Sequence, residues 1–236
     1  MRVDIQGVGF DNVSKDEAVE AALKLLSADK SSYIVTPNPE IVWSARNNPF
    51  LKKALIEADL VLADGVGITL AAKLYKTPLK ERVPGIDFAV ALLQRLVKSG
   101  SSIFLFGAKP GVAELAAQNL TEKHEGLVVL GTNDGFVDDS ASLIDKINKL
   151  SPDVLLVCLG SPKQELWIAE NISKLNVKLC IALGGSLDVF AGIVKRAPEI
   201  FRKTGFEWLY RLIKQPQRIK RMIRLPLFLM HALLKR

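Results

Sequence analysis

Histidine, cysteine and long apolar runs are all scarce in this chain of 236 residues. The two histidines, His124 and His231, lie far apart, and the two cysteines, Cys158 and Cys180, have no CxxC spacing. These counts argue against a zinc site, a disulfide framework and a hydrolase triad. Because both cysteines lie in apolar stretches, LLVCLG and KLCIALG, we expect them to be buried free thiols.

Targeting and metal-binding signals are also missing. The first residues, MRVDIQGVGF, lack the charged start and apolar stretch of a signal peptide, and no run of about 18 apolar residues occurs. We therefore expect a cytoplasmic protein that does not span a membrane. There is no Asp-x-Asp pair to hold a divalent ion against a nucleotide diphosphate, so we expect neither a metal nor another cofactor.

Basic side chains are concentrated near the C-terminus. Residues 195–236 contain 12 of the 32 lysines and arginines but only two of the 25 acidic residues, which gives this segment a net charge of +10 and leaves −3 elsewhere. We expect an α/β catalytic domain over residues 1–196 and a basic, amphipathic, helical appendage over residues 197–236. Such a segment favours an anionic membrane, a phosphorylated substrate or nucleic acid as partner.

Short apolar, β-branched runs alternate with longer helical patterns. We expect strands at 32–36, 59–63, 102–107, 127–131, 153–160 and 178–185, and helices that include 85–99, 110–124 and 139–149. Continuous apolar strands alternating with helices predict a Rossmann-like, mostly parallel sheet with helices on both faces. A sheet of this class binds ligands beyond the carboxyl ends of its strands.

Residues with distinctive chemistry lie at those strand ends. The motifs are TPNPE (36–40), DGVG (64–67), GAKPG (107–111), NDG (133–135), GSPKQE (160–165) and GGSLD (184–188). In three of them, Asn38-Pro39, Lys109-Pro110 and Ser161-Pro162, the dipeptide fits the cap and first position of a helix. The free N–H groups at such helix starts would suit a diphosphate.

Each candidate side chain at this edge has a structural alternative. Asp64 follows DLVLA and precedes glycine, so its carboxylate is either a turn or cap group or a general base at the sheet edge. Asn38 fits a helix cap, and Gln164 has capping-box spacing from Ser161. Thr36 fits an ordinary strand end.

Arg82 and the segment DGVGITLAA leave further choices open. Arg82 precedes a Pro-Gly turn and is either solvated or a phosphate ligand. Gly65, Gly67 and Ala71 resemble part of a dinucleotide fingerprint, but the acidic residue expected about 20 positions later is missing. A nucleotide-sugar or dinucleotide-binding oxidoreductase is therefore the main alternative function, and a noncatalytic membrane-surface adaptor is a third.

The basic appendage has a helical charge pattern. Arg211, Lys214, Arg218 and Arg221 recur at spacings of three, four and three, which places them on one helical stripe, although Pro216 should break or kink it. The segment fits either a packed terminal helix with a solvated basic face or a helix lying in an anionic membrane interface. Nucleic acid is not expected, because no recognised binding motif is present.

Taken in order, the motifs resemble the WecG/TagA/CpsF family of glycosyltransferases. The resemblance rests on TPNPE, ADGVGI (63–68), RVPGIDF (82–88), FLFGAKPGVAE (104–114), NDGF (133–136), LGSPKQE (159–165), GGSLDVFAG (184–192) and KRAPEIFRKTGFEWLYRL (195–212). It covers almost the whole chain.

The resemblance implies an inverting, metal-independent transfer of N-acetylmannosamine from a UDP donor to N-acetylglucosamine on a polyprenyl diphosphate, as in the teichoic-acid linkage-unit branch. It implies that Asp64 is the base and that Thr36, Asn38, Arg82 and Gln164 contact substrate. With this reading, the appendage arginines Arg211, Arg218 and Arg221 are expected to neutralise diphosphate. We expect the protein on the inner face of the cell membrane, and self-association as a homo-oligomer stays open.

Overall fold

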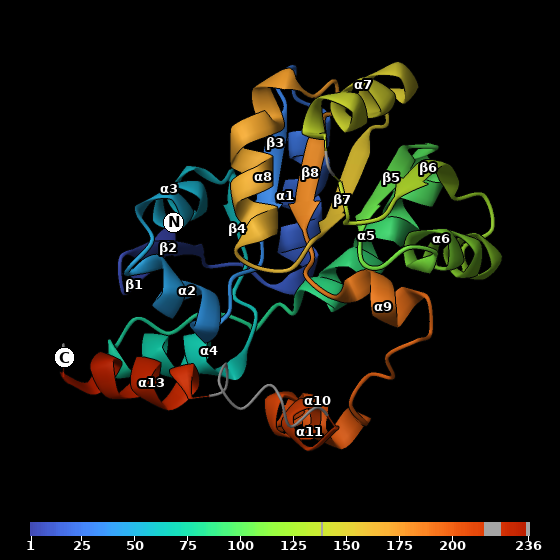
Figure 1. Ribbon diagram of the computed structural model, residues 1–236. Helices are drawn as coiled ribbons and strands as arrows, with labels where there is room; N and C mark the ends of the chain where they lie inside the picture. The colour runs from blue at the N-terminus through green and yellow to red at the C-terminus, as the bar shows by residue number, and fades with distance from the viewer. Residues whose placement is uncertain (138, 215–222, 235–236) are drawn as a thin grey trace.

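A parallel β-sheet forms the centre of the computed structural model, which describes residues 1–137, 139–214 and 223–234. Within these ranges the sheet has six strands in the order β4-β3-β8-β7-β5-β6 (Figure 1). The strands are β3 (Ser32–Val35), β4 (Leu60–Val61), β5 (Ser102–Gly107), β6 (Val128–Asn133), β7 (Val154–Cys158) and β8 (Leu179–Ala182). The predicted Rossmann-like α/β class is confirmed, and each expected strand is present.

The strand order reverses within this sheet. The connection from β5 leads outward to the edge strand β6, whereas the connection from the neighbouring β7 leads back to β8. Loops that leave adjacent parallel strands in opposite directions open a crevice at the carboxyl ends. The reversal lies between β5 and β7, which precede GAKPG and GSPKQE, whereas TPNPE and DGVG follow β3 and β4 at the same edge of the sheet.

Helices cover both faces of the sheet because its strands are apolar on both sides. In β7, Leu155 and Val157 belong to one core, while Val154, Leu156 and Cys158 belong to the other. Helices α1 (Lys15–Leu26), α5 (Gly85–Ser99), α6 (Val112–Lys123) and α9 (Ser186–Phe190) cover the second core. The first is covered by α2 (Pro39–Ala45), α3 (Pro49–Glu57), α4 (Val66–Leu74), α7 (Ser140–Leu150), α8 (Lys163–Asn171) and α13 (Arg224–Leu234). A short 3₁₀ helix, η1 (Ile172–Lys174), follows α8.

An N-terminal hairpin, which the sequence reading did not anticipate, extends the first core. Strands β1 (Arg2–Ile5) and β2 (Val8–Asp11) pair antiparallel around Gln6 and Gly7. Both turn residues have positive φ, 57° and 84°, as a tight two-residue hairpin turn requires. The inward residues Ile5 and Phe10 are fully buried, so the hairpin is part of the domain.

The C-terminal segment adds α10 (Glu199–Lys203), α11 (Glu207–Lys214) and α13 beyond the carboxyl ends of the strands (Figure 1). Phe228 and Ala232 of α13 are fully buried in the first core, against residues of the hairpin, α2 and α4. Among the described residues, no helix combines the length and apolar character needed to cross a membrane. Cys158 and Cys180 are buried and free, as expected.

Candidate active site at the carboxyl edge of the sheet

Asp64 lies where β4 gives way to α4. The preceding residues 61–63 are buried, whereas Asp64 itself is half-buried, so its side chain is at the boundary of the core. Its backbone N–H donates to the carbonyl of Pro37 at 3.3 Å, which joins the 63–67 loop to the 36–40 loop. Gly65 has φ +105° and comes close to Asn38 and Pro39. A side chain here would be strained, so glycine allows the sharp turn after Asp64.

Thr36 and Asn38 follow the neighbouring strand β3, and both side chains bond to the protein. The Thr36 hydroxyl donates to the carbonyl of Ala182 at 3.0 Å and is buried. The Asn38 side chain accepts from Ile41 N at 3.1 Å and caps α2, with Pro39 in the first turn. The cap proposed for Asn38-Pro39 is confirmed, and the same loop lies beside Asp64.

Arg82 lies in the loop that leads into α5, next to the same two loops. The backbone N–H of Val83 donates to the carbonyl of Ala63 at 2.9 Å, and a Cβ on Gly85 would lie 2.8 Å from the Thr36 hydroxyl oxygen. The Arg82 guanidinium donates to the carbonyl of Arg202 in α10 at 2.8 Å. Arg82 is therefore half-buried and tied to the C-terminal segment, which corrects the picture of a merely solvated residue.

Gln164 lies after β7 and is buried with its side chain directed into the protein. Its amide oxygen accepts from Gly184 N at 2.8 Å, and its amide nitrogen donates to Glu165 at 2.9 Å. The capping box with Ser161, the structural alternative for Gln164, does not form, because α8 begins at Lys163 and its cap, Pro162, makes no side-chain capping hydrogen bond. Gln164 instead joins the loops after β7 and β8.

Glu165, which the sequence reading did not single out, is 1% exposed. Burial raises the pKa of this carboxyl, although the hydrogen bond from Gln164 opposes the shift. One carboxyl oxygen is buried without a hydrogen-bond partner among the described residues. Its place in the SPKQE motif was the available signal, but a glutamate in a helical pattern normally indicates a solvated face.

The helix start predicted from Lys109-Pro110 is also wrong. After Lys109-Pro110 the helix α6 begins at Val112, with Gly111 as its cap at φ 82°. The chain therefore makes an additional left-handed turn before the helix, which Pro110 alone does not reveal.

Helix α13 of the C-terminal segment packs against α2 and α4. Arg224 donates to the Ser44 hydroxyl at 2.6 Å and lies 3.7 Å from the Glu40 carboxylate. A Cβ on Gly67 would lie 2.5 Å from Pro39 Cγ and 2.6 Å from Leu225 Cδ1. Gly67 thus permits close packing of protein side chains at the start of α4, and this observation does not favour a dinucleotide in that position.

The structure brings most of the predicted side chains to one edge. Loops after β3 and β4 place Thr36, Asn38 and Asp64 together, and the hydrogen bond from Val83 to Ala63 brings Arg82 beside them. Gln164, in the first turn of α8, contacts the loop after β8 at the same edge. The backbone of Arg211 lies in α11, but its side chain, like the whole of Arg218, Pro216 and Arg221, lies outside the described residues. Within the described ranges, no three histidine, cysteine, aspartate or glutamate side chains gather as a metal site would require.

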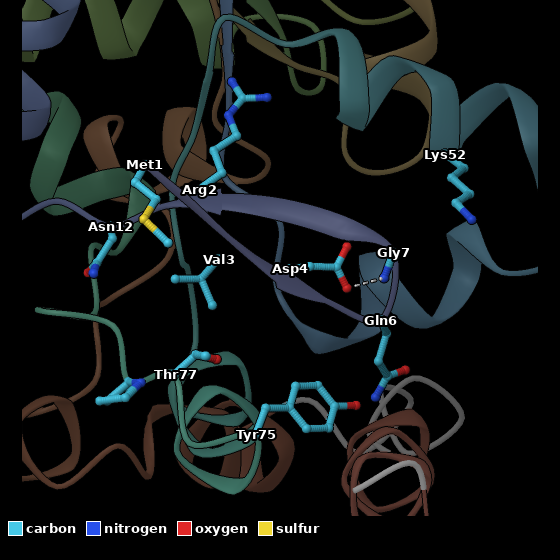
Figure 2. Close-up of a pocket in the computed structure, with 11 residues that line it drawn as sticks. Met1, Arg2, Val3, Asp4, Gln6, Gly7, Asn12, Lys52, Tyr75 and Thr77 are labelled. Atoms are coloured by element: carbon cyan, nitrogen blue, oxygen red, sulfur yellow. Dashed lines mark hydrogen bonds between the residues drawn. The ribbon is translucent and has the colours of Figure 1, made fainter.

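A separate cavity of about 720 Å³ lies beside the N-terminal hairpin (Figure 2). Asp4, Gln6, Lys52 and Tyr75 line it, and Asp4 accepts from the backbone N–H of Gly7 at 3.1 Å. Gln6 also donates to the carbonyl of Phe228 at 2.9 Å, which ties the hairpin to α13. None of the predicted site residues whose side chains the structure describes lines this cavity.

Known proteins match almost the whole chain in sequence. A sequence model of the glycosyl transferase WecG/TagA/CpsF family matches residues 3–236. An N-acetylglucosaminyldiphosphoundecaprenol N-acetyl-beta-D-mannosaminyltransferase from Bacillus spizizenii is 37% identical over 201 residues, covering 85% of this chain and 78% of that protein. A protein of the same name from Staphylococcus aureus strain MRSA252 is 36% identical over 232 residues, covering 97% of this chain and 91% of its own length.

Proposed function

The chain belongs to the WecG/TagA/CpsF family of glycosyltransferases, and from this premise we propose that it transfers N-acetylmannosamine from UDP-N-acetylmannosamine to undecaprenyl-diphosphate-linked N-acetylglucosamine. The observation that carries the proposal is the similarity to the Staphylococcus aureus relative across 97% of the chain, because it spans every strand-end motif. The reaction would be a step in the synthesis of the wall teichoic acid linkage unit. An oxidoreductase is not favoured by these matches.

The proposed chemistry is a single inverting displacement. Asp64 takes the proton from the acceptor hydroxyl as that oxygen attacks the anomeric carbon from the face opposite UDP. The new bond joins the acceptor oxygen to the anomeric carbon, while the bond to the β-phosphate oxygen breaks and its electron pair leaves with UDP. The half-buried position of Asp64, after a buried strand and beside two other strand-end loops, supports this role.

Negative charge develops on the departing diphosphate and must be stabilised by the protein. We assign this task to arginines, without a metal. Arg82 lies beside the Asp64 loop, and Arg211, Arg218 and Arg221 of the appendage are proposed to complete the site. We propose that Thr36, Asn38 and Gln164 also contact substrate, and their hydrogen bonds to the backbone or to a neighbouring side chain hold the surrounding loops in place.

The test is release of UDP from UDP-N-acetylmannosamine, measured with a short-chain prenyl-diphosphate N-acetylglucosamine as acceptor. Asp64→Asn should lower turnover by about 10²–10⁴-fold and leave UDP affinity nearly unchanged, because the amide keeps the shape but cannot accept the proton. Asp29→Asn, in an exposed loop at the opposite end of the sheet, is the matched control. Unchanged turnover in Asp64→Asn would remove Asp64 from the role of base.

We further propose that residues 1–196 form the catalytic domain and that residues 197–236 hold the enzyme at the inner face of the cell membrane. Apolar side chains of the appendage support this, since Ile213, Met230 and Leu234 are 65%, 54% and 79% exposed. Full-length protein should sediment with phosphatidylglycerol vesicles but only weakly with phosphatidylcholine vesicles. Ile213→Asp with Leu234→Asp should reduce this binding, and equal binding to both vesicles would contradict the proposal.

A further inference from the structure

Asp87 and Arg196 form an ion pair that the proposed chemistry leaves without a role. Arg196 Nη1 lies 2.7 Å from Asp87 Oδ1, and Nη2 lies 3.0 Å from Oδ2, so the pair is bidentate. The side chain of Arg196 is only 21% exposed and that of Asp87 only 34% exposed. The pair joins the first turn of α5 to the segment between α9 and α10. Parallel hydrogen bonds of this kind fix both the position and the orientation of the guanidinium.

The pair lies beside the loop that carries Asp64. The start of α5 is held there by the Val83 to Ala63 hydrogen bond and by the contact between Gly85 and Thr36. Arg196 also interacts electrostatically with Asp64 itself. A fixed positive charge therefore stands near the proposed base, and Asp87 is the counter-charge that reduces its effect.

Charged groups from several elements surround the pair. Lys15 of α1 and Arg202 of α10 act on Asp87, while Glu207 of α11 acts with Asp64 on Arg196. Partial burial opposes the charged form of both members, but their mutual hydrogen bonds and the surrounding charges together outweigh it. They lower the pKa of Asp87 and raise the pKa of Arg196, so both remain charged at neutral pH.

We propose that Asp87 and Arg196 are a positioning pair that sets the ionisation of Asp64 through their charges. Arg196 favours the Asp64 carboxylate, which is the form that can accept a proton, and Asp87 limits that effect. This inference rests on the proposed role of Asp64 as the base. Arg196 acts through Asp64 and not on the substrate.

The two halves of the pair must then have opposite effects on the pH profile. The acidic limb of kcat/KM against pH reports the ionisation of the essential base in the free enzyme. Arg196→Gln should move this limb upward by about one pH unit, the size expected for losing one charge at short range in a partly solvated site. Asp87→Asn leaves Arg196 unopposed and should move the limb downward. Arg196→Lys keeps the charge and should stay near the wild-type position.

Circular dichroism first establishes that each full-length variant is folded, and UDP release is then measured across the pH range. Arg95→Gln, which breaks an ion pair with Glu20 on the exposed face of the same helix, is the control and should leave the limb in place. The inference is overturned if Arg196→Gln and Asp87→Asn shift the acidic limb in the same direction, or if neither shifts it. A pair with a purely structural role would not produce shifts whose direction depends on which charge is removed. Unchanged turnover in Asp64→Asn would instead refute the role of Asp64 as the base, so the two failures are distinguishable.

Discussion

Replacing Phe228 with alanine tests whether α13 is an integral part of the domain. Phe228 is fully buried, and its backbone carbonyl accepts from Gln6 of the N-terminal hairpin, 222 residues away in the sequence. Truncating a fully buried phenylalanine costs about 3–5 kcal/mol, the sum of lost transfer free energy and the cavity that remains. Phe228→Ala should therefore lower the free energy of unfolding by an amount in this range.

The expected loss of unfolding free energy is large enough to be measured by urea denaturation. For a chain of this length, a urea dependence of about 3 kcal/mol per molar gives a midpoint lower by about 1 M or more. Met230→Ala is the matched control on the same helix. Its side chain is 54% exposed, so its truncation should change the free energy of unfolding by less than about 0.5 kcal/mol.

A local response is the second measurement, because a terminal helix can detach before the domain unfolds. Protease cleavage within α13 should be faster in Phe228→Ala than in Met230→Ala. Turnover should also fall, since α13 places Leu225 against Gly67, three residues after Asp64. The reasoning fails if the two variants have the same urea midpoint and the same cleavage rate.

Two further predictions follow from buried groups near the site. Burial raises the pKa of Glu165 above the ordinary value of 4.5, so as pH rises past 4.5 the unfolded chain releases its proton first and the free energy of unfolding falls. Glu165→Gln should thus be more stable than wild type at pH 8 but not below about pH 4. Urea unfolding at both pH values measures this, and a difference in the free energy of unfolding that does not depend on pH would contradict the prediction. Gly67→Ala should lower the melting temperature, because the added Cβ would lie 2.5 Å from Pro39 and 2.6 Å from Leu225, although alanine normally stabilises a helix by about 1 kcal/mol. A more stable Gly67→Ala variant would show that α13 does not pack there.

Local errors in the sequence reading have local physical causes. The hairpin was missed even though Val3, Ile5, Val8 and Phe10 alternate with polar or small residues, because each run is only four residues long. Proline predicted three helix starts, but only Asn38-Pro39 supplies a capping side chain. At the other two junctions, a left-handed glycine and a proline cap shift the helix start by one or two residues.

The sequence by itself determined the sheet and the edge at which Thr36, Asn38 and Asp64 meet. Apolar runs end directly before these residues, and parallel strands bring all their carboxyl ends to one side. Only the tertiary structure decided which side chains Gln164 contacts, that Glu165 is buried, and that Asp87 pairs with Arg196. The last two residues are 109 positions apart, and neither local propensity nor periodicity specifies a partner at that distance. The packing of α13 was also decided only by the tertiary structure. An apolar terminal helix predicts that one of its faces is buried, but it does not predict which surface of the protein that face covers.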